Sequence, residues 1–96
     1  MAAYMLIAAK IHDRERFVSG YGKAAAELVA EYGGRYVVLA PGAELLEGSL
    51  AGYSSVAVSE WPNRQRALDF WNSDAYADIK KLREGIADVE VILVGD

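Results

Sequence analysis

The feature that most constrains the fold of this chain is an apolar run close to its beginning, AYMLIAAKI, at residues 3–11. Side chains alternate between the two faces of an extended strand. The run therefore divides into two sets: Met5, Ile7, Ala9 and Ile11 on one face, and Tyr4, Leu6, Ala8 and Lys10 on the other. A strand that is apolar on both faces is covered on both sides in a folded protein. We expect a central strand with a different layer packed against each face.

An amphipathic helix is predicted directly after this strand. Asp13 is a suitable N-cap, and apolar residues follow at helical spacing: Phe17, Tyr21, Ala24, Ala25, Leu28 and Tyr32. Gly20 and Gly22 interrupt the helix at about 1 kcal/mol each relative to alanine. This cost suggests a close backbone approach at Tyr21, or a helix that depends on packing. Gly33–Gly34 ends the helix, because glycine adopts the left-handed conformation without steric cost.

The rest of the chain is predicted to form three more strands and a divided helical region. The strands are expected at residues 35–40, 54–61 and 89–94. A turn at Pro41–Gly42 follows the first of them, and AELLEG at 43–48 is expected to extend that strand or to form the second arm of a small hairpin. The expected helix caps are Asn63 and Ser73, the inward residues of the second helical stretch are Tyr76, Ile79 and Leu82, and Gly85 ends it.

The order of these elements, β-α-β-β-α-β, predicts a single α+β domain over residues 1–96 with the ferredoxin-like fold. In that fold a four-stranded antiparallel sheet carries both helical regions on one face, and right-handed crossovers place the first and third strands in the middle. The other face of the sheet then presents Tyr4, Leu6 and Ala8 to solvent. A large exposed apolar patch marks an interface. We therefore expect a homodimer that packs sheet against sheet.

Composition limits the possible functions. The chain has no cysteine, which excludes disulfides, a thiol nucleophile and thiolate metal sites. Its formal net charge is −4 and its acids and bases alternate, so nucleic-acid binding is not expected. The basic cluster of Lys80, Lys81 and Arg83 lies late in a helical stretch, where cations complement the helix dipole. The apolar start is too short to cross a membrane and lacks a signal peptide's basic segment, so we expect a cytoplasmic protein.

Several short motifs, spread over almost the whole chain, carry a family resemblance. They are GGRY at 33–36, LEG at 46–48, Glu60 with Pro62, Asn72 and Ser73 with Tyr76, and Arg83. In this order and spacing they resemble the bacterial domain-of-unknown-function family 1330, which belongs to the dimeric α/β-barrel superfamily. The chain departs from the family pattern at Trp61, Asn63, Trp71, Asp74 and Ala75. The resemblance implies a dimer of ferredoxin-like subunits and implies no reaction.

The leading candidate site combines Arg35, Glu47 and Glu60. Arg35 begins the second strand and Glu60 ends the third, so a hairpin brings them together, and Glu47 lies in the connection between the two strands. A guanidinium with two carboxylates is suited to fixing a substrate carboxylate, with Glu60 or Glu47 as a general base. The alternative is a structural network of ion pairs that holds the loop to the sheet.

Aromatic residues supply the other candidate binding groups. Tyr21, Tyr36 and Trp71 are suited to lining a pocket between sheet and helices, with tyrosine hydroxyls orienting a ligand. The alternative is ordinary core packing. His12 is the only histidine, so no metal site is expected. The second half of the chain has no histidine, cysteine or methionine to ligate haem, and we expect no cofactor.

Two functions remain open on these residues. The first is a small-molecule site between sheet and helices, with cofactor-free isomerase- or monooxygenase-type chemistry on a small aromatic or anionic compound. Dimeric α/β-barrel relatives with such chemistry make this an expectation by analogy. The second is a non-catalytic dimeric module, structural or ligand-sensing, in which the same residues stabilise the fold. A cavity shared by Tyr21, Trp71 and Arg35 would favour the first.

Overall fold

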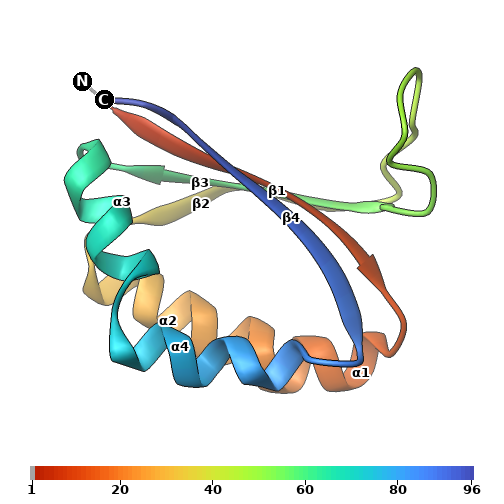
Figure 1. Cartoon of the computed structure of the whole chain (residues 1–96), viewed down its shortest axis with the longest axis horizontal. Helices are drawn as coiled ribbons and strands as arrows, with labels where there is room; N and C mark the ends of the chain where they lie inside the picture. The colour runs from red at the N-terminus through yellow and green to blue at the C-terminus, as the bar shows by residue number, and fades with distance from the viewer. Residues whose placement is uncertain (1) are drawn as a thin grey trace.

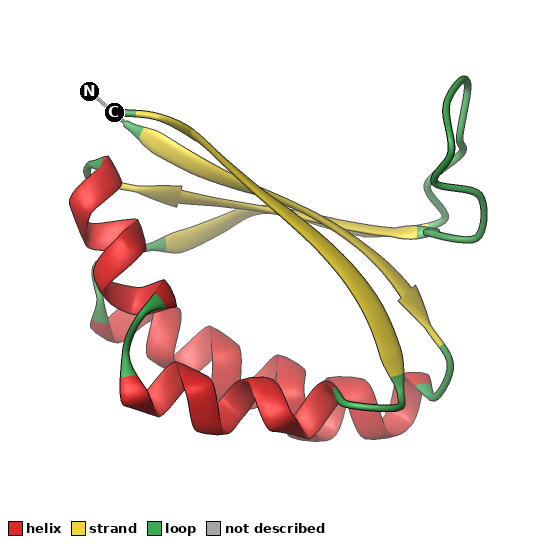
Figure 2. Cartoon of the chain, in the orientation of Figure 1, coloured by secondary structure: helices red, strands yellow, loops and turns green. Residues whose placement is uncertain are grey.

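The computed structural model describes residues 2–96 and shows one sheet above a layer of helices (Figure 1). The elements, in order, are β1 (Ala3–Ile11), α1 (Arg14–Arg16), η1 (Phe17–Gly22), α2 (Lys23–Glu31), β2 (Arg35–Pro41), β3 (Ser55–Trp61), α3 (Arg64–Trp71), α4 (Asp74–Lys80), η2 (Lys81–Arg83) and β4 (Ala87–Gly95). All the helices lie on one side of the sheet, and the opposite side carries none (Figure 2).

The sheet has the strand order β2-β3-β1-β4, and every neighbouring pair is antiparallel. β1 and β3 are therefore the central strands, as the element order predicts. β1 pairs with β4 from Ala3 opposite Gly95 to Ile11 opposite Ala87, which leaves the start of β1 beside the end of β4 (Figure 1). The predicted fold class, α+β and ferredoxin-like, is confirmed.

The alternation of side chains along the central strands separates a buried face from an exposed one. Met5 and Ala9 of β1 are buried on the side that faces the helices, together with Ser59 and Trp61 of β3. Leu6 points to the other side and is 40% exposed. The strand periodicity therefore predicts correctly which face of the sheet packs against the helices.

The helical segment after β1 contains a feature that the sequence pattern does not predict. Asp13 caps it by accepting from the backbone N–H of Arg16 at 3.1 Å, but residues Phe17–Gly22 then form a π-helix. A methyl group on Gly20 would meet no atom within 4 Å, and one on Gly22 would stand 3.4 Å from the Phe17 carbonyl oxygen. The expected close approach is therefore absent at Gly20, and both glycines lie in this wider turn.

The second helical region follows its predicted caps. Asn63 accepts from the N–H of Arg66 at 2.9 Å, and Ser73 accepts from the N–H of Tyr76 at 3.1 Å. Gly85 follows the last helical turn with φ of 77°. The prediction that Leu82 faces inward is wrong: it is 49% exposed, because the helix tightens to a 3-10 turn at η2 and loses the α-helical spacing.

Residues 42–54, which we call the arm, connect β2 to β3 without regular structure. The prediction of a strand at 43–48 is wrong. Three glycines of the arm, Gly42, Gly48 and Gly52, have positive φ, and these turns interrupt an extended run. The backbone bond from Ala43 N to Ser54 O, 2.8 Å long, closes its base. The arm rises from the end of the sheet on the side away from the helices (Figure 1).

The open face is the sheet surface opposite the helices. Its exposed apolar side chains include Leu6, Val38, Ile92 and Val94. A patch of this kind, with exposed apolar side chains on three of the four strands, is unusual for a surface that contacts only water. Within residues 2–96, none of the helices has the length and apolar character needed to cross a membrane.

Candidate functional site

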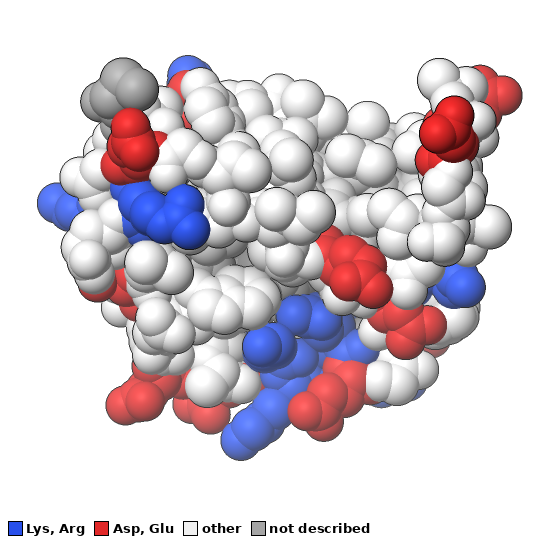
Figure 3. All heavy atoms as spheres, turned by 45° about the horizontal axis from the view of Figure 1, so that its top comes forward, with Lys and Arg blue, Asp and Glu red and all other residues white. Residues whose placement is uncertain are grey.

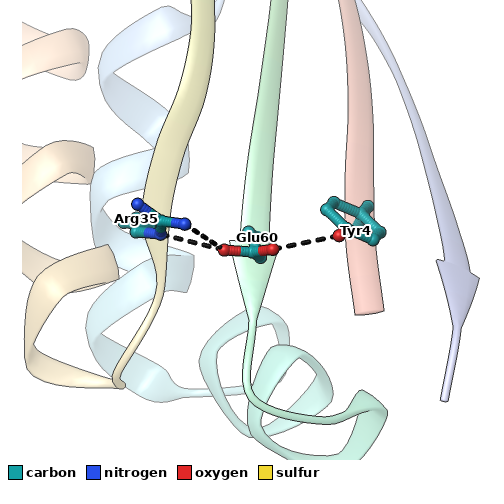
Figure 4. Close-up of polar contacts among 3 residues, drawn as sticks. All are labelled: Tyr4, Arg35 and Glu60. Atoms are coloured by element: carbon teal, nitrogen blue, oxygen red, sulfur yellow. Dashed lines mark hydrogen bonds and ion pairs between the residues drawn. The ribbon is translucent and has the colours of Figure 1, made fainter. Parts of the chain in front are cut away.

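Arg35, Glu60 and Tyr4 form one polar row across three strands at an end of the open face (Figure 4). Arg35 lies opposite Glu60 in the β2–β3 ladder, and Glu60 lies opposite Tyr4 in the β3–β1 ladder. The Arg35 guanidinium reaches Glu60 Oε1 with Nη2 at 2.7 Å and Nε at 2.9 Å. The Tyr4 hydroxyl donates to Glu60 Oε2 at 2.9 Å. Both carboxylate oxygens of Glu60 are therefore engaged.

These contacts set the ionisation of the row. The hydrogen bond from Arg35, with a smaller contribution from Tyr4, holds the pKa of Glu60 below its usual value. The hydrogen bond to Glu60 raises the pKa of Tyr4. Glu60 is thus a stable carboxylate at neutral pH, and each of its oxygens already accepts at least one hydrogen bond. The Arg35–Glu60 pair fits the alternative of a structural ion pair. The roles of Arg35 as a substrate anchor and of Glu60 as a general base stay predictions.

The structure separates Glu47 from this row, so the three-residue constellation expected within one chain is wrong. Arg35 and Glu60 pair at one end of the hairpin, whereas Pro41 and Ser55 pair at the other end, where the arm begins. Six residue steps along β2 separate Arg35 from Pro41, or about 20 Å at roughly 3.3 Å per residue. The connection between two antiparallel strands emerges at the end away from Arg35.

A second cluster lies on the helix side of the sheet, around Tyr76. The hydroxyl oxygens of Tyr21 and Tyr76 are 2.7 Å apart, and the Tyr76 ring is 2% exposed. The ring of Trp71 lies 5.2 Å from that of Tyr76, and Tyr36 packs against the same core. Tyr21, Tyr36 and Trp71, which the sequence predicts as candidate ligand-binding residues, are thus gathered around Tyr76, which it predicts to face inward.

Burial dominates the ionisation of these phenols. It raises the pKa of Tyr21 far above its usual value, and the neighbouring Tyr76 hydroxyl raises it further. Burial, followed by the nearness of Tyr76, raises the pKa of Tyr36 to about 12. Tyr21 and Tyr36 are therefore neutral at any physiological pH, and they are suited to donating a hydrogen bond rather than to acting as bases.

Arg83 connects this aromatic cluster to the protein surface. Its guanidinium carbon lies 5.4 Å from the centre of the Tyr21 ring, and its Nε is buried without a hydrogen-bond partner. On the outer side, Arg83 borders a hollow of about 320 Å³ whose other lining residues are Ala77, Lys80, Lys81, Glu84 and Ala87. Lys80 also lies over the Trp71 ring at 4.5 Å. Figure 3 shows basic side chains gathered on this side of the molecule.

We call Tyr21, Trp71, Tyr76 and Arg83, with the hollow beside Arg83, the helix-side site. Spacing alone did not identify Arg83, because a cation near the end of a helix is explained by the helix dipole. The available signal was the family motif, which includes both Tyr76 and Arg83. Arg35 is not part of this site: it borders a different hollow, of about 300 Å³, with Ala2, Gly33, Glu60, Trp61 and Pro62. Neither of these two hollows is lined by Tyr21, Trp71 and Arg35 together, the arrangement that would favour a shared small-molecule pocket.

Within residues 2–96, no group of three or more histidine, cysteine or acidic residues is positioned to hold a metal ion. The acidic side chains of the two sites are instead paired or isolated. Glu60 is engaged by Arg35 and Tyr4, and Glu84 is the one carboxylate that lines the hollow beside Arg83.

The sheet topology and the helices on one face of the sheet define an α+β domain with the ferredoxin-like fold. Comparison with family models then places the chain. It belongs to the family described as domain of unknown function DUF1330, whose model matches residues 2–96. A search of curated protein sequences finds no match.

Solved structures of similar fold come from several organisms. RPA0582 of Rhodopseudomonas palustris, a protein of unknown function, is 17% identical with a TM-score of 0.79, over 99% of this chain and 82% of that one. The N63A mutant of SnoaB, a cofactor-independent oxygenase from Streptomyces nogalater, is 15% identical with a TM-score of 0.73, over 99% and 92%. At3g17210 of Arabidopsis thaliana is 18% identical with a TM-score of 0.73, over 100% and 95%. At these identities the likeness concerns the fold.

Proposed function

We propose that the protein binds a small aromatic or otherwise apolar organic anion at the helix-side site. The observation that carries this proposal is the state of Arg83, whose Nε is buried without an acceptor while its guanidinium lies over the Tyr21 ring. A buried donor without a partner costs free energy. A carboxylate or enolate oxygen of a ligand in the adjacent hollow would offset that cost with a charge-assisted hydrogen bond to the guanidinium of Arg83.

The hollow beside Arg83 supports the same class of ligand. Its volume of about 320 Å³ lies at the small end of the ~300–1,000 Å³ range of ligand pockets. Three of its lining residues are cations, Lys80, Lys81 and Arg83, against the single carboxylate of Glu84. The remaining lining residues, Ala77 and Ala87, leave room for an apolar body. The lining therefore favours a compact molecule with one negative group.

The chemistry that we propose is cofactor-free and of isomerase or monooxygenase type. Guanidinium and phenol groups stabilise an anion that forms when a substrate loses a proton next to a carbonyl or on a ring. For an oxygenase, an activated methylene and O₂ would give a ketone and water, with one oxygen atom in each product. The structural likeness to a cofactor-independent oxygenase supports this class by analogy of fold. A non-catalytic, ligand-sensing role would use the same anion site.

A binding experiment tests the proposal. A panel of small aromatic carboxylates and phenols is screened by thermal shift, and hits are measured by calorimetry on the wild type, Arg83→Met and Arg35→Met. We expect Arg83→Met to weaken binding at least tenfold and Arg35→Met to leave it unchanged, because only Arg83 borders the site. Equal affinity in all three proteins would contradict the proposal, and so would a panel in which every ligand has a dissociation constant in the millimolar range or above. Hits are then incubated with O₂ to look for turnover.

We further propose that the protein is a homodimer through the open face. Leu6, Val38, Ile92 and Val94 are 40–59% exposed there, and the partner that suits an apolar sheet face is a second copy of it. Sedimentation of the wild type at micromolar concentration is expected to give a dimer. Ile92→Asp is expected to shift it to monomer, whereas Val18→Asp, at an equally exposed helical position, is expected to leave it dimeric. A monomeric wild type would contradict the dimer.

A further inference from the structure

The arm exposes apolar side chains that a single chain does not cover. Leu46 is 88% exposed, Leu45 is 43% exposed and Leu50 is 39% exposed. The arm stands beyond the end of the sheet, on the side of the open face (Figure 1). Three leucines held in water on one short segment point to a contact with another surface. Because the arm stands on the side of the open face, the surface that it contacts belongs to the molecule that covers that face.

The acids of the arm and the arginines at the far end of the sheet have opposite charge. All the charged residues of the arm are acids, Glu44 and Glu47. The far end carries Arg35, whose side chain is 73% exposed, and Arg64, which donates to the Gly95 carbonyl at 3.0 Å. Glu60 occupies only one side of Arg35. Each chain therefore presents the two carboxylates of the arm at one end, where Lys10 lies over Tyr53, and exposed arginines at the other, where Glu60 pairs with Arg35.

This polarity selects one arrangement of two sheets that pack face to face. A two-fold axis along the strands would place the two arms at the same end and the two Arg35 ends at the other. An axis across the strands reverses one sheet, so that each arm meets the arginine end of the other chain. Opposite charges then face each other twice, once at each end, as an isologous interface requires.

The arginine end also offers a recess for the arm. A hollow of about 300 Å³ lies there, lined by Ala2, Gly33, Arg35, Glu60, Trp61 and Pro62. Its apolar lining residues suit contact with a leucine side chain, and the guanidinium of Arg35 suits a carboxylate. Leu46 and Glu47 are adjacent in the arm, which matches an apolar recess beside an arginine.

We propose that the arm of each chain clasps the arginine end of a second copy, with Leu46 in this hollow and Glu47 against the partner's Arg35. The inference rests on the proposed dimer and adds its orientation and its contact residues. It joins Arg35, Glu60 and Glu47 between two chains, although one chain holds Glu47 far from the other two. The two-chain cluster stabilises the assembly and closes the hollow beside Arg35.

Cysteine cross-linking tests this arrangement on a chain that contains no cysteine of its own. Glu47→Cys and Arg35→Cys proteins are purified separately, mixed so that subunits exchange, and oxidised. Cysteines about 20 Å apart along the strands within one chain are too distant for an internal disulfide, because a disulfide needs Cα atoms within about 7 Å. We expect a cross-linked dimer in the mixture, and far less when either protein is oxidised alone.

A second pair and a matched control complete the test. Leu46→Cys mixed with Pro62→Cys probes the same contact while keeping Arg35, and it is expected to cross-link as well. Glu47→Cys mixed with Asp69→Cys is the control, because Asp69 lies on α3, on the helix side of the sheet. A wild type that sediments as a dimer while both test pairs cross-link no better than the control overturns the arm contact alone. A monomeric wild type overturns the arm contact together with the dimer.

Discussion

Gly34 lies directly against the indole ring of Trp61, so closely that a methyl group at Gly34 would stand 2.8 Å from two of the ring carbons. Trp61 is 1% exposed and is held in place by Phe70, whose ring centre is 5.0 Å away. The neighbouring Gly33 has a different reason to be glycine, since its φ of 85° is in the left-handed region. One glycine of the pair allows the chain to turn, and the other makes room for a tryptophan.

Gly34→Ala is expected to destabilise the protein by about 1–3 kcal/mol, as overpacking in a core does. Gly20→Ala is the matched change, because a methyl group at Gly20 meets no atom within 4 Å. It is expected to raise stability by about 0.5–1 kcal/mol through helix propensity and a less flexible unfolded chain. Urea unfolding of both variants measures the two effects. Equal effects of the two substitutions would contradict the steric role of Gly34.

Ser59→Ala is expected to lower stability by about 1–3 kcal/mol, because it leaves a buried donor without its acceptor. The Trp61 indole Nε1–H donates to Ser59 Oγ at 2.9 Å, and both residues are 1% exposed. Ser19→Ala, in an exposed helical position, serves as the control and is expected to change stability little. Thermal melts followed by tryptophan fluorescence measure both. A Ser59→Ala protein as stable as the control would show that the indole finds another partner.

The alkaline titration of the tyrosines is expected to occur in two stages. A phenol whose pKa is raised by folding contributes stability that is complete below its ordinary value of 10 and is lost as pH rises through the folded value. For Tyr36 that loss runs from pH 10 to about pH 12, and for Tyr21 it extends to higher pH. Absorbance of tyrosinate, followed as pH rises, is expected to show a late stage that coincides with unfolding. Tyr21→Phe and Tyr36→Phe should each reduce that stage, and an unchanged late stage would contradict the burial of these phenols.

Acid is expected to remove the contribution of the Arg35–Glu60 pair. The pKa of Glu60 is lowered in the folded chain, so its stabilising contribution is present above the ordinary value of 4.5 and is lost as pH falls through the folded value. Wild type is therefore expected to be more stable than Glu60→Gln at pH 7, with the difference shrinking below about pH 4.5. Melting temperatures of both proteins from pH 3 to 7 provide the check. A difference that grows in acid would contradict the assigned direction.

Periodicity in the sequence is sufficient to predict which face of the sheet is buried, but it does not predict the contacts between elements. The alternation from Ala3 to Ile11 depends only on strand geometry, and it identifies correctly the residues that face the helices. The adjacency of Arg35 and Glu60 follows from hairpin pairing in the same way. Glu47 was misplaced because a position between two residues in the sequence says nothing about which end of the hairpin a loop leaves.

The helix-side site depends on packing that local patterns do not record. The hydroxyls of Tyr21 and Tyr76 meet across 55 residues of sequence. Their meeting requires the π-helical turn at Phe17–Gly22 and the docking of η1 beside η2. A basic residue near a helix end is explained equally well by a dipole or by a ligand, so Arg83 gained significance only when its buried Nε and the adjacent hollow were located.

The pairing of β1 with β4 has a mechanical consequence. Ala3 lies opposite Gly95, so the first and last strands of the described chain are antiparallel neighbours with their outer ends together. A force that pulls these two ends apart acts on the interstrand bonds one after another, because the bonds run perpendicular to antiparallel strands. The hydrogen bonds between β1 and β4 therefore break one at a time, and the sheet opens under low force. A protein tethered by these ends in an optical trap would yield from β4 and β1 inward, and the β2–β3 hairpin would remain paired longest.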